Sequence, residues 1–205
     1  RGTPGPHATA KDLVLAMARQ LGAGGLLGHA AEVTGPAADA LDLAGRIAAN
    51  VNVDGGNVWG RTEDVAIIGM GKSDLEDRLV ELAALQDREV VGEPDPDKGY
   101  YYRSDQLNFA KIGVPALYFK PGNRFRGRPA DWGREVNDRW CRETYHQPSD
   151  EIADDWDLSG MVEDARLAFG VGLAVAEGDG LPRWRPGDEF EDVRTEALAA
   201  AASDD

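Results

Sequence analysis

Short, continuous apolar runs are spread along the chain and are typical of strands buried inside a sheet. They lie at residues 47–53, 65–69 and 114–119, and a shorter pair at 90–91 predicts another strand. The run at 13–18 fits either a buried strand or the start of a helix, because its period alone does not decide between them.

The clearest helical pattern covers residues 73–85, where four leucines recur on one face: Leu75, Leu79, Leu82 and Leu85. Ser73 stands where a capping side chain would satisfy the first backbone N–H groups, and Glu76 supplies the matching carboxylate three residues later. The pattern therefore predicts an amphipathic helix that begins at a capping box.

Three further segments have helical character, at 104–110, 158–176 and 189–202, while 120–144 reads as a long polar loop rich in Gly, Arg and Trp. Strands that alternate with helices predict an α/β domain. We expect a layered α/β/α arrangement around a mixed, mostly parallel sheet.

The chain is long enough for one domain with a real core, since domains usually hold roughly 100–200 residues. We treat residues 1–205 as a single, partial domain with flexible ends at 1–10 and 189–205. The chain opens at Arg1 without a methionine, so the domain is expected to be incomplete at its N-terminus.

Charge and composition narrow the classes of partner. With 37 acidic and 22 basic residues, the net charge of −15 argues against nucleic acid and against a polybasic membrane contact. No apolar run is long enough for a membrane span, and no signal peptide is visible.

Cys141 is the single cysteine, so an internal disulfide is excluded; a plain loop thiol is favoured over a nucleophile. Nothing in the composition predicts an oligomeric state.

Asp54 is the first candidate for a functional side chain, because it follows the apolar run at 47–53. The carboxyl end of a buried strand is where α/β folds place ligands and catalytic groups. The alternative is a simple turn, since Asp54 and the Gly-Gly-Asn that follows it are typical turn residues.

His146 is the second candidate, and it is the only histidine in the C-terminal two thirds of the chain. Imidazole is a common zinc ligand when a neighbouring group fixes its tautomer. Tyr145 and Asp150 beside it favour that interpretation over a solvated loop histidine, although Asp150 could equally cap a turn or helix.

The tyrosine run Tyr100 to Tyr102 lies between these two candidates. It is interpreted either as strand packing or as a phenol that donates a hydrogen bond to an oxyanion. Arg103 beside it could bind a carboxylate through its guanidinium fork. Five arginines in the segment 120–139 are more simply explained as a solvated loop balanced by nearby acids.

Three of these segments, taken in order and spacing, resemble the C-terminal half of the catalytic domain of the co-catalytic di-zinc aminopeptidases, metallopeptidase family twenty-eight. The matching motifs are Asn52-Val-Asp54, then Tyr101-x-Arg-Ser-Asp105-x-x-x-Phe109-Ala110-x-x-Gly113-Val-Pro115-Ala116, then Tyr145-His146-x-x-x-Asp150. The resemblance covers about residues 45–175. Any one motif alone would be weak, but their order makes the resemblance fairly specific.

The resemblance implies a peptidase with two zinc ions held by two histidines, two aspartates and a glutamate, with a second glutamate as general base. Asp54 then matches an aspartate ligand and His146 the last histidine ligand. Tyr101 matches, more weakly, the tyrosine that steadies the tetrahedral intermediate. Two zinc ions roughly 3.5–4 Å apart lower the pKa of a shared water and polarise the peptide carbonyl.

The chain departs from the family pattern at its start. The family's first histidine and bridging aspartate belong to a segment that this sequence does not contain. Its Glu-Glu pair normally precedes Gly-Leu-Leu-Gly, which is present at 25–28, but Gly22 and Ala23 occupy the two glutamate positions. Only two of the five ligands can be assigned, and catalytic zinc takes three protein ligands.

The sequence thus predicts a zinc-dependent exopeptidase that removes N-terminal residues from peptides, with weak or no activity in the chain as given. The alternatives are an inactive peptidase-fold domain kept for binding, and a non-catalytic α/β domain with structural motif matches. Peptide is the expected partner. The resemblance favours a periplasmic or extracellular location.

Overall fold

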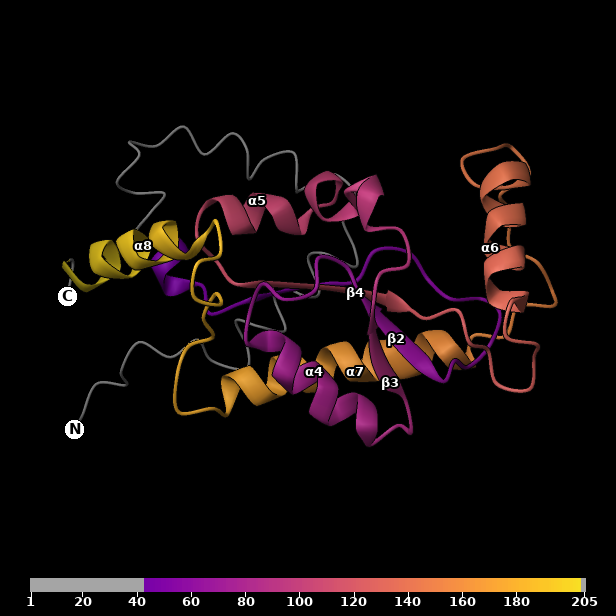
Figure 1. The fold of residues 1–205 in the computed structure, drawn as a ribbon, viewed down its shortest axis with the longest axis horizontal. Helices are drawn as coiled ribbons and strands as arrows, with labels where there is room; N and C mark the ends of the chain where they lie inside the picture. Colours follow the sequence, from indigo (N-terminus) through magenta and orange to yellow (C-terminus); the bar gives the residue numbers. More distant parts are fainter. Residues whose placement is uncertain (1–42, 204–205) are drawn as a thin grey trace.

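The computed structural model describes residues 43–203, which form an α/β domain (Figure 1). Its strands are β1 (Asn50–Asn52), β2 (Asp64–Ile67), β3 (Glu89–Gly92) and β4 (Ala116–Pro121). Its α-helices are α4 (Leu75–Ala84), α5 (Gln106–Lys111), α6 (Trp132–Glu143), α7 (Ser159–Ala176) and α8 (Glu191–Ser203). Two 3-10 helices, η1 (Pro96–Lys98) and η2 (Tyr100–Arg103), precede α5.

The four strands form one open sheet in the order β1-β4-β2-β3. β4 runs parallel to β1 and antiparallel to β2, while β2 runs parallel to β3. The predicted α/β fold with a mixed, mostly parallel sheet is therefore confirmed. The register places Asn52 opposite Tyr118 on the neighbouring strand, which decides the geometry of the candidate site.

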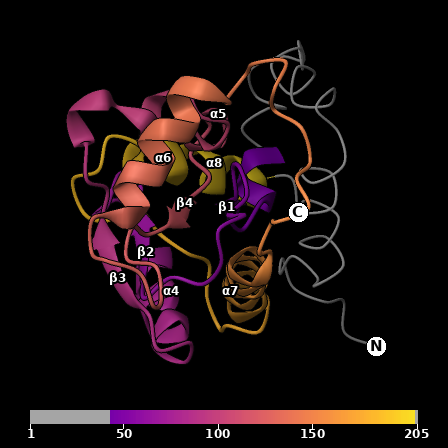
Figure 2. The ribbon, with the colours of Figure 1, turned by 90° about the vertical axis from the view of Figure 1, so that its right-hand side faces the viewer.

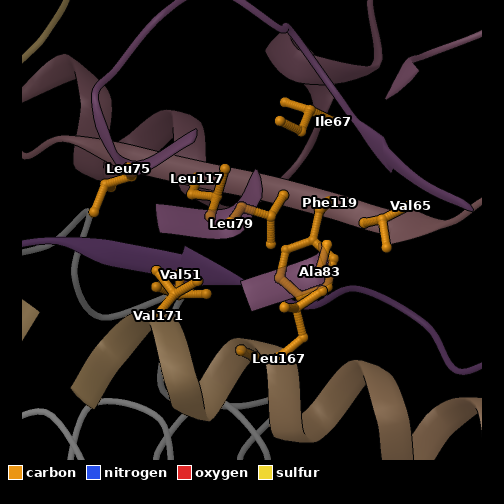
Figure 3. Close-up of a cluster of buried hydrophobic side chains, with 11 residues drawn as sticks. Val51, Val65, Ile67, Leu75, Leu79, Ala83, Leu117, Phe119, Leu167 and Val171 are labelled. Carbon is orange, nitrogen blue, oxygen red and sulfur yellow. The ribbon is translucent and has the colours of Figure 1, made fainter. Parts of the chain in front are cut away.

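Successive residues of β4 point to opposite faces of the sheet, as strand geometry requires, and so divide the interior into two cores. Leu117 and Phe119 join the first core with residues of β1, β2, α4 and α7. The buried members of this core, which we call the aliphatic face (Figure 3), are Val51, Val65, Ile67, Leu75, Leu79, Ala83, Leu117, Phe119, Leu167, Ala168 and Val171.

Ala116 and Tyr118 point the other way, into a core with a different composition. We call this the aromatic face; its buried members are Ile68, Tyr101, Ala110, Ala116, Tyr118, Trp184 and Phe190. Figures 1 and 2 show α5 and α8 on this side of the sheet and α4 and α7 on the other. The layered α/β/α arrangement follows from this alternation.

The C-terminal segment packs closely against the rest of the domain. Ala197 on α8 is fully buried, and the Trp184 indole N–H donates to the Gly113 carbonyl at 2.9 Å. Gly113 has φ +88°, and a Cβ there would lie 2.7 Å from the backbone of Arg194, so only glycine allows this approach. Residues 189–203, expected from sequence to be a flexible end, thus contain a helix with a buried face; their mobility stays a prediction.

Two expectations about local structure are wrong. Residues 132–143 form α6 rather than part of a long loop, because Trp132, Val136 and Trp140 recur at helical spacing within a strongly polar sequence. The first turn of α4 is also different: the helix begins at Leu75, and within the described residues the Ser73 hydroxyl has no hydrogen-bond partner.

The carboxylate of Glu76 still makes the contact that the capping box predicts for it, because it accepts the Ser73 N–H at 3.4 Å. It accepts backbone N–H groups of Gly71 at 2.9 Å and of Lys72 at 2.8 Å, which fixes the turn that leads into the helix. The expectations for residues 1–10 and 13–18 lie outside the described residues. Across residues 43–203, none of the helices combines the length and apolar character needed to cross a bilayer.

Candidate functional site

Asp54 lies just beyond the end of β1, on the aromatic face, with its side chain exposed to solvent. Because Asn52 is in register with Tyr118, Asp54 falls on the same side of the sheet as the Tyr118 ring. The Tyr118 hydroxyl donates to Asp54 Oδ2 at 3.3 Å. Burial raises the pKa of Tyr118 above its ordinary value, so the phenol keeps its proton and acts as a donor.

A buried amide network supports β1, the strand that precedes Asp54. Asn52 Nδ2 donates to Gln106 Oε1 at 3.0 Å, and Gln106 Nε2 donates to the Tyr101 carbonyl at 2.6 Å. Gln106 is fully buried on α5. The network ties β1, α5 and η2 together, so the Asp54 carboxylate projects from a backbone held on two sides.

Tyr101 lies inside the aromatic face, with only 3% of its surface exposed. Its hydroxyl is buried and has no hydrogen-bond partner among residues 43–203, and burial raises its pKa. Its ring lies against Tyr102 and Phe190. The oxyanion role of Tyr101 stays a prediction; in this structure its hydroxyl does not reach the surface.

Lys72 and Glu189 form an ion pair beside the Tyr101 ring. Lys72 Nζ lies 4.8 Å from the centre of the Tyr101 ring and pairs with Glu189 Oε1 at 2.8 Å. The Tyr102 hydroxyl donates to the same oxygen at 2.6 Å. These two hydrogen bonds, that from Lys72 first, lower the pKa of Glu189. Through Glu189, the C-terminal segment is thereby bound to Lys72 and to the tyrosine run.

His146 lies in a turn that follows α6, exposed to solvent and with φ +59°. Its imidazole stacks on the Tyr145 ring, with centroids 3.9 Å apart. Tyr145 in turn lies 4.8 Å from Trp140 on α6, and Trp140 lies 6.0 Å from Trp59. Trp59 follows Asp54 by five residues, so a chain of aromatic rings joins the segment of His146 to the segment of Asp54.

Backbone hydrogen bonds join the same two segments a second time. The Gly60 N–H donates to the Asp157 carbonyl at 3.0 Å, and the Asp157 N–H donates to the Val58 carbonyl at 2.9 Å. The loop after β1 and the connection from α6 to α7 are therefore packed as one unit, at the same end of the domain as α6 (Figure 2).

The residues described do not by themselves fit a zinc site. Within 43–203, no three His, Cys, Asp or Glu side chains come together closely enough to hold a metal ion, and a catalytic zinc needs three protein ligands. Asp54 contacts Tyr118 and His146 contacts Tyr145. Their roles as ligands stay predictions, and Gly22 and Ala23, which replace the family's glutamate pair, lie outside the described residues.

Sequence reasoning overlooked Tyr118 and Lys120. Lys120 Nζ lies 5.3 Å from the centre of the Tyr118 ring. The alternation of β4 indicates that residues 118 and 120 share a face, but only the register with β1 shows that this face is the one that bears Asp54.

A hollow of about 540 Å³ lies elsewhere, near the start of β3, and Asp54 is not part of its lining. Two of its guanidinium groups already have partners: Arg124 pairs with Glu89 at 2.6 Å, and Arg88 pairs with Asp164 at 2.7 Å. Its lining residues are Glu63, Ala84, Asp87, Arg88, Glu89, Arg124 and Arg126. Because these guanidinium groups are already paired with carboxylates, the hollow is a weaker candidate for a ligand site than the surface around Asp54.

Comparisons with known proteins match the chain to a protein family and, over a short segment, to a curated protein. Residues 15–170 match the family described as Peptidase family M28. The chain is also 45% identical over 56 residues to the 3-isopropylmalate dehydratase large subunit of Anaeromyxobacter dehalogenans (strain 2CP-1 / ATCC BAA-258); the match covers 27% of this chain and 12% of that protein. No solved structure matches.

The family match covers the elements that bear the candidate site. It extends over about three quarters of the chain and includes β1, η2, α5, β4, α6 and the His146 turn. The match to the dehydratase subunit spans about an eighth of that protein, so its activity is not carried over to this chain. The chain belongs to peptidase family M28.

Proposed function

We propose that the protein is an exopeptidase of the aminopeptidase type, that zinc is its metal, and that peptides bind around Asp54 on the aromatic face. Membership of peptidase family M28 supports a hydrolytic, peptidase-type function. The removal of N-terminal residues and the dependence on zinc rest on the motif resemblance.

One observation supports this location above all others. The Asp54 carboxylate is exposed just beyond the carboxyl end of β1, whose three residues are buried, and this is where α/β folds place ligands. The buried Tyr118 hydroxyl holds one of its oxygens, while the rest of the carboxylate faces solvent. An exposed carboxylate in a fixed orientation suits either a cation or the ammonium group of a peptide.

We also propose that the 205-residue chain turns over peptides weakly or not at all. Gly22 and Ala23 replace the glutamate that would bind metal and the glutamate that would carry a proton to the leaving amine. A general base contributes roughly 10²- to 10⁴-fold to the rate of such reactions. Losing the base together with a metal ligand is expected to reduce hydrolysis to near background.

The test is the rate at which the purified chain hydrolyses leucine p-nitroanilide. The rate is measured with added zinc and again after a chelator has removed the zinc. We expect near-background rates and less than one zinc per chain. The double variant Gly22→Glu/Ala23→Glu should then bind more zinc and hydrolyse faster, and Asp54→Asn in that background should remove the gain. Rapid, chelator-sensitive turnover by the unaltered chain would contradict the weak-activity proposal.

An inactive peptide-binding domain is the second candidate. It is favoured by the finding that, within residues 43–203, neither Asp54 nor His146 belongs to a group of three side chains that could hold a metal ion. This candidate predicts that the double glutamate variant binds peptides but still fails to hydrolyse them, whatever the zinc concentration. The two candidates therefore differ in the outcome of a single restored-site experiment.

A further inference from the structure

Three cationic side chains surround one aromatic ring, that of Tyr100. Lys120 Nζ lies 5.6 Å from the centre of the Tyr100 ring, and Lys98 Nζ and the Arg103 guanidinium carbon each lie 5.9 Å from it. Because all three are within 6 Å of a common centre, no two of them are more than about 12 Å apart. Such a concentration of positive charge is unexpected in a chain with a net charge of −15.

The three cations differ in how their charge is compensated. Lys98 is paired with Asp95 at 3.2 Å. Neither Lys120 nor Arg103 forms an ion pair with any carboxylate among residues 43–203, although acidic residues outnumber basic ones. Two positive charges held beside the same ring without a counter-ion attract an anion from solution.

The two cations are restrained to different degrees: Lys120 is partly buried, and Arg103 is exposed with one long hydrogen bond. Lys120 is half-buried at the end of β4, and its ammonium group lies near both the Tyr100 and the Tyr118 rings. Arg103 donates from Nη1 to the Lys98 carbonyl at 3.4 Å, which leaves other N–H groups of its fork for a carboxylate. Binding an anion here therefore costs less side-chain conformational entropy than binding it to freely moving side chains.

Tyr118 connects this cluster to the proposed peptide site. Its ring lies beneath Lys120, and its hydroxyl donates to Asp54. The Asp54 carboxylate and the Lys120 ammonium group thus contact the same tyrosine, so groups of opposite charge lie on one side of the sheet. A peptide offers matching charges when it has a free ammonium terminus and an acidic side chain close to it.

We propose that Tyr100, Arg103 and Lys120 form a subsite for the acidic side chain of a peptide, so that the protein prefers peptides with glutamate or aspartate near the N-terminus. This inference rests on the proposed function, because peptide as the ligand is taken from it. The carboxylate pairs with Lys120 and Arg103, and the peptide ammonium group lies toward Asp54.

Salt concentration affects the subsite and the whole protein differently. The overall charge of −15 repels an acidic peptide at long range, but at 0.15 M salt this repulsion is screened beyond about 8 Å. Contacts at hydrogen-bond distance are screened much less. The preference is therefore best measured at physiological ionic strength.

Equilibrium binding of two matched pentapeptides tests the proposal. Both have a free N-terminus, a C-terminal amide and an uncharged fluorophore; one has glutamate at positions two and three, and the other has glutamine there. Fluorescence anisotropy gives each Kd for the full 205-residue chain and for the variants Lys120→Gln, Arg103→Gln and Lys111→Gln. Lys111 is an exposed lysine at the end of α5 and serves as a charge-matched control.

We expect the glutamate peptide to bind about two- to fivefold more tightly than the glutamine peptide, as is typical of a partly exposed ion pair. Lys120→Gln and Arg103→Gln should each reduce this ratio toward one, and Lys111→Gln should leave it unchanged. Circular dichroism melts of each variant show whether the fold is retained, and Arg103→Gln provides the test if Lys120→Gln does not fold.

Three results would overturn the proposal. Equal binding of the two peptides, or equal loss of preference in Lys111→Gln, would remove the subsite and leave the proposed peptidase function standing. Displacement of the glutamate peptide by inorganic phosphate at the same concentration and ionic strength would show a general anion site instead. Failure of both peptides to bind would contradict the proposed function as well.

Discussion

The two faces of the sheet bury side chains of different kinds. The aliphatic face is lined by Val, Ile, Leu, Ala and one Phe (Figure 3), and α4 and α7 cover it (Figure 1). The aromatic face contains Tyr101, Tyr118, Trp184 and Phe190, together with the buried amides of Asn52 and Gln106.

The two faces differ in whether their buried side chains require specific hydrogen-bond partners elsewhere in the chain. Apolar side chains on the aliphatic face need only to be buried, and burial is not directional. The aromatic face combines polar groups that need specific partners, and those partners lie 54 residues apart in the case of Asn52 and Gln106. We infer that stability is concentrated on the first face and ligand chemistry on the second.

The largest expected effect is on the aliphatic face. Leu79 is fully buried on α4, so Leu79→Ala should lower the free energy of unfolding by about 2–5 kcal/mol, because it removes buried methyl groups and leaves a cavity. Urea unfolding measures the change. Leu85 is 82% exposed at the end of the same helix, and Leu85→Ala should cost less than about 0.5 kcal/mol. Similar losses in both variants would mean that the aliphatic core is not packed as described.

A smaller effect is expected from the amide network of the aromatic face. Gln106→Leu removes the acceptor of the Asn52 hydrogen bond and the donor to the Tyr101 carbonyl. Loss of hydrogen bonds to buried polar groups should lower the free energy of unfolding by about 1–3 kcal/mol. Asn108→Leu, an exposed substitution on the same helix, is the control. A variant as stable as the wild type would contradict the network.

Tyr118→Phe tests the link between the aromatic face and Asp54. The variant keeps the buried ring and loses the hydrogen bond to Asp54 Oδ2, so stability should fall by about 0.5–1.5 kcal/mol. Tyr145→Phe removes a hydroxyl from an exposed ring on the His146 side and should have almost no effect. If thermal unfolding ranks the two variants in the opposite order, Tyr118 does not hold Asp54.

The smallest expected change in the free energy of unfolding concerns the ion pair that binds the C-terminal segment to Lys72. Glu189 is about half exposed, so its ion pair with Lys72 should contribute less than about 1 kcal/mol, and Glu189→Gln should cost no more than that. Because the pKa of Glu189 is lowered in the folded state, this contribution is present above the unfolded-state pKa of about 4.3 and is lost as the pH falls through the folded-state pKa.

Urea unfolding of wild type and Glu189→Gln between pH 7 and pH 3 measures that dependence. The stability difference between them should shrink toward zero in acid. Glu196→Gln, at an exposed position on α8, is the control and should show no such trend. A difference that grows as the pH falls would show that Glu189 is not stabilised by Lys72.

Sequence reasoning succeeded where a local pattern determines the structure. The apolar runs located β1, β2 and β4, and the leucine spacing located α4, because burial requires those periods. It failed at 132–143, where three well-spaced apolar side chains are outnumbered by charges, so the helical period of α6 was overlooked.

The candidate site was only partly accessible to sequence reasoning, for a different physical reason. Asp54 could be proposed because it follows a buried run. Its partner Tyr118 could not, because no local pattern specifies the register between β1 and β4. For the tyrosine run the sequence left packing and an oxyanion role open, because the burial of Tyr101 depends on Phe190, which lies 89 positions further along the chain.

Hydrogen–deuterium exchange with and without a saturating glutamate-containing peptide tests most directly whether ligand chemistry belongs to the aromatic face. We predict slower exchange in η2 and in the segments that follow β1 and end β4, with no change in α4 or α7. Slower exchange confined to α4 or α7, with the segments around Asp54 and Tyr100 unaffected, would contradict the account.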